Sequence, residues 1–389
     1  MKILQIIPHY VPAFCFGGPL RVAHSLGKSL VANGHKVTVC TTNLNGDNSF
    51  LDAPLDKKVN IDGVYVYYEA VENIKWGYSS SLKNRITKEI KTADIVITHF
   101  HYQYASYIGG LFARKYNKPL IVFAHGSLNK NGIYKRNTLL KYLYIRFFEN
   151  KNFKYANFIT FNCAEELELS FFSKNGKIIP NGVDPNDFLK HSSKSLYLDK
   201  YPQLKGKQVY IYLGRLNYTQ KGIEILLPAF KKAIQKNNLL HLVLAGPDEN
   251  NGELLIRKAI VDLELTQYVT ITGMLNDSEK IDMLNISDVF VLPSPSEGLS
   301  IALLEALYMN LPVITTTGVG LHKTIQKNDA GIIIDYDQDQ LSEAILSLTY
   351  GNQFEKFSKN GKNLINGKFT WDVIVAQFIE KIKKVLENH

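Results

Sequence analysis

The chain has 389 residues, of which 45% are hydrophobic and 21% are charged, and its formal net charge is +9. These proportions are ordinary for a globular protein and exclude a disordered or low-complexity chain. A single hydrophobic core rarely grows beyond about 250–300 residues, so the length predicts two domains. No apolar run reaches the roughly 18 residues of a transmembrane helix. Residues 1–8 predict a first strand rather than a signal peptide.

The basic excess belongs to the first half of the chain. Residues 1–184 contain 23 Lys/Arg and 13 Asp/Glu, a net charge of +10, whereas residues 185–389 contain 22 and 23, a net charge of −1. This asymmetry indicates an anionic partner, either a membrane or a nucleic acid. No nucleic-acid motif is present, so nucleic acid is the weaker choice. The three scattered cysteines predict no disulfide framework and no metal site, and they suit a reducing, cytoplasmic compartment.

The first half alternates β-prone runs with helical patterns, which is typical of a parallel, doubly wound sheet. We expect a helix after Asn162, which forms a capping-box-like start with Glu165. Strands are expected at residues 2–7, 35–41, 64–68, 94–98, 119–124, 156–161 and 177–180, and helices at 20–32, 81–91 and 105–116.

Several loops of this half follow predicted strands. Gly17 and Gly18 precede the helix at 20–32 without the GxGxxG spacing of a dinucleotide site, yet they allow close backbone approach to a ligand at a helix N-terminus. A plain turn explains them equally well. His99 and His101 follow a strand, but no third ligand is spaced nearby, so a non-metal role is favoured. His125 ends a strand before a glycine, where open α/β sheets bind ligands.

Residues 130–154 combine seven Lys/Arg with one acidic residue and many aromatics. Basic and aromatic groups together on helices are typical of a membrane interface. The alternative is a helix packed through its aromatics with a solvated basic face. Tyr142 and Phe147 are candidate interfacial groups. The candidate membrane-facing residues are Lys135, Arg136, Lys141 and Arg146.

The second half repeats the alternation after a polar stretch, residues 185–206, which is interpreted as a linker. Arg215 and Lys221 flank the loop after the first strand of this half, the usual place for phosphate contacts. Pro228 lies inside the following helix and is expected to kink it. Strands are expected at 209–213, 241–245, 269–272, 289–292, 311–314 and 331–335, and helices at 223–236, 255–263, 278–285, 300–309, 340–347 and 371–387.

The stretch 288–314 carries two carboxylates in an apolar setting, Glu297 in a loop and Glu305 in the helix. An unpaired carboxylate in such a setting is very costly. Glu305 therefore has a buried basic or hydroxyl partner, or it faces a cleft that polar ligands enter. The backbone N–H groups of residues 298–300 lie at the start of the helix, an end that binds phosphate. The alternative is a core helix with one neutralised glutamate.

Asp335, Asp337 and Asp339 resemble the DxD signature with which some transferases hold a metal. They lie between a strand and a helix, where acidic side chains commonly cap the helix, and capping is the favoured interpretation. No His/Asp/Glu cluster has convincing ligand spacing, so no metal and no cofactor are predicted.

Taken in order, these motifs resemble those of the retaining glycosyltransferases of family 4, over essentially the whole chain. Residues 8–21 resemble enzymes of bacterial cell-surface polysaccharide assembly. The motifs that carry the family resemblance are Pro180–Asp184, Gly214-Arg215, Lys221-Gly222, Gly246-Pro247, Thr272-Gly273, and Glu297 and Glu305 with seven residues between them.

The resemblance implies the GT-B fold, which is an α/β architecture of two facing Rossmann-like, doubly wound parallel-sheet domains with a cleft between them. Residues 1–185 would form the acceptor-side domain, and residues 186–370 the domain that binds the nucleotide sugar. The final helix, 371–389, would cross back to the first domain.

The resemblance also implies roles for the candidate residues. Arg215 and Lys221 would hold the donor diphosphate, and Glu297 would bind hydroxyls of the donor sugar. His125 would lie beside that sugar, and Glu305 would bind the ribose. The implied backbone contacts are Gly17, Gly18 and Gly246 near the donor, Gly273, Met274 and Leu275 beside the base, and Gly298, Leu299 and Ser300 at the phosphate.

No covalent nucleophile is assigned, which suits a front-face retaining mechanism. One departure follows Gly320, where family members commonly have an acidic residue and this chain has residues 321–323, Leu-His-Lys.

The expected function is metal-independent transfer of a sugar from a UDP- or GDP-sugar to a glycan or lipid-linked acceptor in bacterial surface-polysaccharide synthesis. The site would be cytoplasmic, at the inner face of the plasma membrane if the basic surface binds it. Two alternatives are a GT-B-like sugar-nucleotide epimerase, which would convert donor without acceptor, and a catalytically silent nucleotide-sugar-binding subunit.

Overall fold

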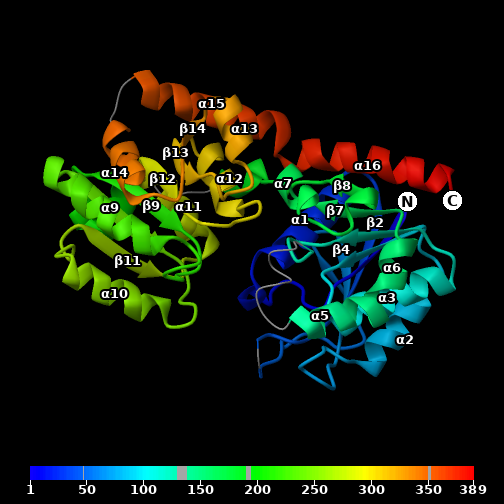
Figure 1. Cartoon of the computed structure of the whole chain (residues 1–389). Helices are drawn as coiled ribbons and strands as arrows, with labels where there is room; N and C mark the ends of the chain where they lie inside the picture. Colours follow the sequence, from blue (N-terminus) through cyan, green and yellow to red (C-terminus); the bar gives the residue numbers. More distant parts are fainter. Residues whose placement is uncertain (47, 129–137, 190–193, 349–351) are drawn as a thin grey trace. The chain divides into compact units, whose positions relative to one another are not determined.

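The computed structural model describes residues 1–46, 48–128, 138–189, 194–348 and 352–389 (Figure 1). The chain divides into two compact units. The first unit consists of Met1–Asn181 and Trp371–His389, and the second of Gly182–Thr370. Each unit has its own sheet and its own hydrophobic core.

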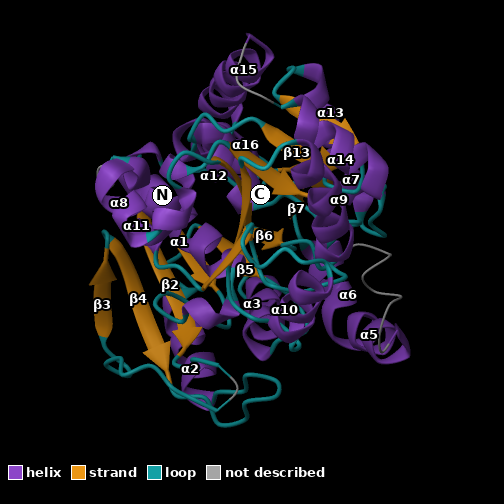
Figure 2. Ribbon diagram, turned by 90° about the vertical axis from the view of Figure 1, so that its left-hand side faces the viewer, coloured by secondary structure: helices purple, strands orange, loops and turns teal. Residues whose placement is uncertain are grey.

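The sheet of the first unit has the strand order β3-β4-β2-β1-β5-β6-β7-β8. All neighbouring strands are parallel except β3 and β4, which form an antiparallel edge (Figure 2). Central strands such as β5 and β6 are buried throughout, as their continuous apolar runs predict. The strands are β1 Lys2–Ile6, β2 Lys36–Thr42, β3 Lys58–Ile61, β4 Val64–Glu69, β5 Ile95–His99, β6 Leu120–Phe123, β7 Phe158–Phe161 and β8 Gly176–Ile178.

Helices cover this sheet, and the C-terminal helix is one of them. The helices are α1 Gly18–Ala32, α2 Ser80–Glu89, α3 Tyr104–Lys115, α5 Thr138–Tyr144, the π-helix η2 Ile145–Glu149, α6 Asn150–Tyr155, α7 Ala164–Glu168 and α16 Trp371–Glu387, with short 3₁₀ turns at Phe14–Phe16 and Ser173–Asn175. The Phe378 ring of α16 lies 5.6 Å from that of Phe123 in β6 and 6.3 Å from that of Phe158 in β7. The last helix therefore contributes to the core of the first unit (Figure 1).

The sheet of the second unit is parallel throughout, in the order β11-β10-β9-β12-β13-β14. Its strands are β9 Gln208–Leu213, β10 Leu240–Ala245, β11 Val269–Gly273, β12 Val289–Leu292, β13 Val313–Thr316 and β14 Gly331–Ile334. Strands β10 and β11 follow β9 on one side of the sheet, and β12, β13 and β14 follow on the other side. The direction in which strands are added therefore reverses between β9 and β12. Ligands of open α/β sheets bind beyond the carboxyl ends of the strands at such a reversal. In the first unit the corresponding reversal lies between β1 and β5.

The second unit is covered by a further set of helices (Figure 1). They are α8 Lys194–Lys200, α9 Ile223–Lys236, α10 Gly252–Asp262, α11 Asp277–Ile286, α12 Ile301–Tyr308, α13 His322–Lys327, α14 Gln338–Ser347 and α15 Asn352–Lys368, with 3₁₀ turns at Pro185–Phe188 and Pro202–Leu204. Helix α9 continues through Pro228 as a single element.

Two local predictions were wrong. Residues 185–206 are not an extended linker, because Phe188, Tyr197 and Leu204 are buried in the core of the second unit. The capping box that was predicted at Asn162 with Glu165 does not form. Cys163 is the N-cap of α7, and the Asn162 N–H donates to the carboxylate of Glu166, at 2.8 Å, rather than to that of Glu165.

Across the described residues, no helix combines the length and the apolar character that crossing a bilayer requires.

Candidate functional site

Glycines bring the loops at the carboxyl edge of the second sheet together. Gly222 has a φ of +71°, and a Cβ there would lie 1.9 Å from the carbonyl oxygen of Pro293. A Cβ at Gly246 would lie 1.8 Å from the carbonyl oxygen of Gly214. Real Cβ atoms do not approach that closely, so the loops after β9, β10 and β12 pack here only because these residues are glycines. The sequence motifs at 214, 222 and 246 thus have a packing reason as well as the implied ligand-binding one.

Lys221 and Glu297 form an ion pair at the reversal between β9 and β12. Their side chains are only 12% and 22% exposed. The loop before Lys221 is held by Asn217, whose side-chain oxygen accepts from the Gln220 N–H at 3.0 Å. The Glu297 N–H donates to the carbonyl of Gly318 at 3.0 Å, which ties its loop to the one after β13. The structure thus brings these two predicted residues together as a fixed, largely buried ion pair.

Arg215 lies on the same loop but is more exposed, at 56% of its side chain. Its guanidinium pairs with Glu249, which follows β10 and also accepts from the Asn217 amide at 3.1 Å. The Tyr212 hydroxyl donates to the Arg215 carbonyl at 2.8 Å and fixes the backbone, and burial raises the pKa of Tyr212, which keeps the donor protonated. An exposed ion pair contributes only about 0–1 kcal/mol, so an anionic ligand can replace Glu249 at small cost.

Helix α12 begins beside Glu297. Ser300 is its N-cap, and the Ser300 hydroxyl accepts from the Leu303 N–H at 3.3 Å. A Cβ at Gly298 would meet no atom within 4 Å, whereas Leu299 is buried. The open space at Gly298 and the positive end of the helix suit an anion next to the Lys221 ammonium.

Glu305, one turn into α12, is buried, and its carboxylate lies 2.5 Å from the ammonium of Lys280 on α11. Of the alternatives that the sequence left open, the structure thus shows a basic partner for Glu305. Lys280 is also 3.8 Å from Asp277. The pair satisfies Glu305 in the absence of ligand, so its role in binding ribose stays a prediction.

The predicted base-flanking residues lie at the end of β11. Gly273 is the last residue of that strand and has a φ of +71°. Met274 is 61% exposed, and Leu275 packs partly against the core. Asn276 then starts α11 with a capping box to Glu279, which fixes where this short segment leaves the sheet.

The acidic stretch before α14 caps that helix, as the favoured interpretation predicted. Asp337 accepts from the N–H groups of Asp339 at 2.9 Å and Gln340 at 2.8 Å. The Asp339 carboxylate pairs with Lys232, and Asp335 accepts from the Thr317 hydroxyl at 3.4 Å. In the part of the chain that the structure describes, no three His, Cys, Asp or Glu side chains gather as metal ligands.

In the first unit, Gly17 is the N-cap of α1 with a φ of +85°, and Gly18 is the first residue of that helix. A Cβ at Gly17 would meet no atom within 4 Å, so its backbone angle rather than crowding requires glycine. The N-terminus of α1 follows β1, at the reversal of the first sheet. Both glycines therefore lie where the sequence placed them, next to a helix end suited to an anion.

His125 follows β6 with a φ of +48° and is half-buried. Its Nε2 lies 3.0 Å from Nδ1 of His99, whose Nε2 lies 2.9 Å from the side-chain oxygen of Gln5. Burial lowers the pKa of His125 to about 3, and burial with the neighbouring His125 lowers that of His99 well below its usual value. His101 is engaged separately, with Ser127 at 2.9 Å. All three imidazoles are neutral near pH 7.

The described part of the basic and aromatic segment, residues 138–154, forms α5, η2 and most of α6. Lys141 and Arg146 lie on it, whereas Lys135 and Arg136 lie outside the described residues. Tyr144 accepts from the Trp76 indole N–H at 3.0 Å and packs inward. The outward face is more apolar than the sequence alone indicated, with exposed fractions of 70% for Leu139, 67% for Leu140, 60% for Tyr142 and 73% for Phe147. Some aromatics of this segment pack against the first unit and others face solvent, so the packed-helix interpretation holds in part and the membrane contact stays a prediction.

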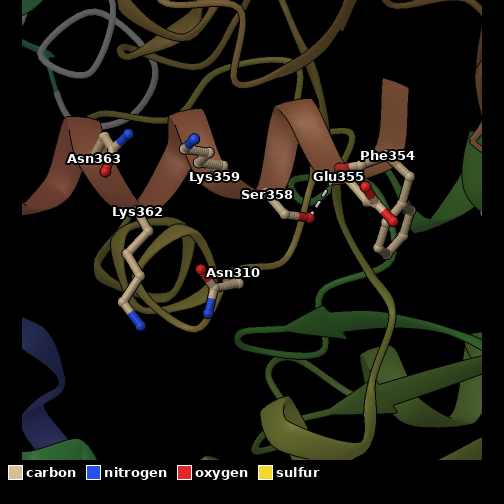
Figure 3. Close-up of a pocket in the computed structure, with 7 residues that line it drawn as sticks. All are labelled: Asn310, Phe354, Glu355, Ser358, Lys359, Lys362 and Asn363. Carbon is tan, nitrogen blue, oxygen red and sulfur yellow. Dashed lines mark hydrogen bonds between the residues drawn. The ribbon is translucent and has the colours of Figure 1, made fainter. Parts of the chain in front are cut away.

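An open groove of about 420 Å³ lies between α15 and the end of α12 (Figure 3). It adjoins the start of β13, at the amino edge of the sheet, whereas ligands of such sheets bind at the carboxyl edge. It therefore does not compete with the Lys221–Glu297 region as the candidate site. Its lining residues are Asn310, Phe354, Glu355, Ser358, Lys359, Lys362 and Asn363.

Comparison with known proteins gives two family matches that together span most of the chain. Residues 16–187 match the model of Glycosyltransferase Family 4, and residues 194–364 match that of Glycosyl transferases group 1. Among curated proteins, an uncharacterized glycosyltransferase of Methanocaldococcus jannaschii is 24% identical, covering 100% of this chain and 99% of its own length. The UDP-Gal:alpha-D-GlcNAc-diphosphoundecaprenol alpha-1,3-galactosyltransferase of Escherichia coli is 28% identical, covering 76% of each chain.

Among solved structures, HepE of Anabaena in complex with UDP superimposes with a TM-score of 0.74 at 16% identity, covering 99% of this chain and 100% of that one. This likeness, over the full length, is to the two-sheet GT-B architecture.

Proposed function

Because this chain belongs to family 4 of the retaining glycosyltransferases and has the GT-B fold, we propose that it transfers a hexosyl group from a UDP-sugar to a lipid-linked saccharide. The supporting observation is the fixed pair of Lys221 and Glu297 at the reversal of the second sheet, with Arg215 on the same loop. The pair offers a cation for a diphosphate and a carboxylate for sugar hydroxyls side by side.

The chemistry of the leaving group explains why cations belong there. In the proposed reaction the bond between the anomeric carbon and the β-phosphate oxygen breaks, and negative charge develops on the diphosphate. Lys221 and Arg215 would stabilise that charge with little movement of the backbone, because Asn217 and Tyr212 already hold their loop in place. The acceptor oxygen bonds to the anomeric carbon on the same face, and its proton passes to the departing phosphate. Configuration is thereby retained without a protein nucleophile.

We propose UDP rather than GDP as the nucleotide. HepE binds UDP, and the E. coli relative is named for UDP-Gal as donor. In this chain the base would lie against the segment from Gly273 to Leu275, and the ribose hydroxyls would meet Glu305. His125 of the first unit would contact the donor sugar.

We propose that the acceptor is lipid-linked and that the enzyme acts in surface-polysaccharide synthesis. The outward face of α5 and η2 supports this proposal. Exposed leucines and Phe147 alternate there with Lys141 and Arg146, the composition of an interfacial helix. The E. coli relative acts on a sugar linked to diphosphoundecaprenol, which resides in a membrane. A peripheral contact with an anionic bilayer would place this enzyme near such an acceptor.

The function is tested by ligand-induced stabilisation followed by turnover. UDP and UDP-hexoses at about 100 times their Kd are expected to stabilise the protein by about 2.7 kcal/mol, and GDP much less. Transfer to diphosphoundecaprenol-linked N-acetylglucosamine is expected to persist in EDTA, since Arg215 and Lys221 neutralise the diphosphate. Donor conversion without acceptor would show an epimerase, and binding without turnover a silent subunit. Activity lost in EDTA and restored by Mg²⁺ or Mn²⁺ would refute metal independence.

The membrane contact has its own test, co-sedimentation with vesicles of increasing phosphatidylglycerol content. Each basic residue near an anionic bilayer contributes about 1 kcal/mol, so Lys141→Ser/Arg146→Ser should weaken binding by about tenfold or more. Leu140→Ser/Phe147→Ser should weaken it at every lipid composition. The matched control is Leu254→Ser/Lys258→Ser on α10, because Leu254 is 70% exposed in the second unit. Equal binding of all four proteins would leave a soluble acceptor as the better proposal.

A further inference from the structure

Three polar side chains form a hydrogen-bonded row across neighbouring strands of the first sheet. Gln5 belongs to β1, His99 ends β5 and His125 follows β6, and these strands are adjacent in the order β1-β5-β6. The two links measure 2.9 Å from Gln5 to His99 and 3.0 Å from His99 to His125. Gln5 and His99 are fully buried, at 0% exposed, and only His125 reaches the surface. The row thus connects a buried amide to one partly exposed imidazole at the reversal of the sheet.

The surroundings of this row are built to hold it. Gly27 of α1 leaves room for Gln5, since a Cβ there would lie 3.1 Å from the Gln5 amide nitrogen. The Ser106 hydroxyl donates to the His99 carbonyl at 2.8 Å, which fixes the end of β5. Phe100 and His125 have φ values of +68° and +48°, and their rings are 5.2 Å apart. Left-handed backbone at bulky residues costs about 1–3 kcal/mol each and clusters at functional sites.

The donors and acceptors along the row determine where the protons lie. The side-chain oxygen of Gln5 accepts only, so Nε2 of His99 donates to it. A neutral imidazole carries one N–H proton, so Nδ1 of His99 has none. It therefore accepts a hydrogen bond from the Nε2–H of His125. The remaining nitrogen of His125, Nδ1, therefore carries a lone pair.

We propose that Gln5 and His99 are positioning residues that hold His125 in the Nε2–H tautomer, so that its Nδ1 accepts a hydrogen bond from a substrate hydroxyl. This rests on the proposed function, in which His125 contacts the donor sugar. The amide nitrogen of Gln5 has no hydrogen-bond partner among the described residues, but both links of the row are made. These links resist rotation of the His125 ring, since loss of either would leave a further unsatisfied buried group. His125 is thus preorganised as a neutral acceptor, and a sugar hydroxyl, rather than an anionic oxygen, is the group that it fits.

The substitution Gln5→Glu should reverse the direction of the hydrogen bonds along the row, with little change in the shape of the side chain. A carboxylate beside His99 favours the imidazolium, which donates from both nitrogens. His125 must then accept at Nε2 and carry its proton on Nδ1. We expect ¹⁵N NMR of the ring nitrogens to show this exchange of the protonated nitrogen, with the signals assigned by His125→Asn. We also expect kcat to fall by about tenfold while KM for the UDP-sugar stays within about twofold, because the second unit holds the nucleotide.

Two further variants complete the test. Gln5→Met removes the acceptor and should leave a mixture of His125 tautomers with an intermediate kcat. The control is His241→Gln, which changes another buried histidine, paired with Thr270 at 2.9 Å in the second unit. It should leave both the His125 tautomer and kcat as in the wild type, and thermal melting verifies the fold of each variant.

The tautomer measurement needs no substrate, so it separates this inference from the proposed function. A wild-type protein with the His125 proton on Nδ1, or an unchanged tautomer in Gln5→Glu, would overturn the inference. Absence of transfer by the wild type, with the expected tautomers, would instead refute the proposed function and leave the row itself established.

Discussion

Replacing Lys221 by alanine is expected to lower kcat by about 10²–10³-fold, the usual loss when one preorganised group that stabilises transition-state charge is removed. Lys221 is 12% exposed, and its loop is fixed by Asn217 and by the close packing of Gly222 against Pro293. Water cannot reproduce a charge held in that position. Arg215→Ala should cost less, because 56% of that side chain is exposed and its backbone is held independently by Tyr212.

Lys231→Ala is the matched control for Lys221→Ala. Lys231 lies in the second half of α9, the helix that follows the Lys221 loop, and also forms a Lys–Glu pair, at 2.9 Å with Glu264. It should leave kcat unchanged, since that pair lies away from the reversal of the sheet. The kcat values of the two variants are compared with saturating UDP-sugar and acceptor. Melting curves verify that both variants are folded. Turnover near the wild-type level in Lys221→Ala would remove the site assignment and leave Glu297 as its structural partner only.

Elements with continuous or periodic apolar patterns were predictable from the sequence. Val289–Leu292 is buried on both faces in the structure, and its four apolar residues identified β12. The edge strand β3 has no fully buried residue and no such run, so no pattern marked it. Helix α15 was missed because its sequence is mostly polar: only four of its residues are buried, and although they have the spacing of one helix face, one of them is a glycine. The prediction of a linker at residues 185–206 was wrong for the same reason, because the buried aromatics of this stretch are spaced among lysines and serines.

The candidate site was predictable as far as it follows from strand ends. Arg215 and His125 come two residues after β9 and β6, and Lys221 lies in the loop between β9 and α9. Within each sheet, parallel strands bring their carboxyl ends to one edge. Their partners were not predictable, because pairing depends on the order of strands and helices. Glu249 meets Arg215 because β10 lies beside β9, and Lys280 on α11 meets Glu305 on α12 although 25 residues separate them in sequence. No local pattern encodes these neighbours.

His99 shows the same limit. The sequence placed it after a strand and favoured a non-metal role without identifying that role. In the structure it is the last residue of β5, and its hydrogen-bond partners come from both sides, from β1 and from the loop after β6. The role of a buried polar residue is thus set by the sheet order rather than by the residues next to it in sequence.

Glu305→Gln is expected to reduce transfer by about 10²-fold, chiefly by raising KM for the UDP-sugar, because a neutral amide binds ribose hydroxyls more weakly than a carboxylate. The same change removes the nearer carboxylate of the Lys280 ammonium, in a side chain that is only 20% exposed, and leaves Asp277 at 3.8 Å. Loss of one partner of a fully buried pair costs about 3–5 kcal/mol, and the partial exposure of Lys280 makes the cost here smaller. Stability and activity therefore both fall in this single variant, and it cannot separate the two roles of Glu305.

The double variant Glu305→Gln/Lys280→Met separates them. Replacing both members of a buried pair by neutral groups is often close to neutral for stability, so the melting temperature should recover relative to Glu305→Gln. If Glu305 binds the ribose, KM for the UDP-sugar stays high in the double variant, because no carboxylate has been restored. Lys280→Met alone should lower the melting temperature yet retain donor binding. Recovery of transfer together with stability in the double variant would contradict the ribose contact, and Glu305 would then serve only to neutralise Lys280 within a core helix.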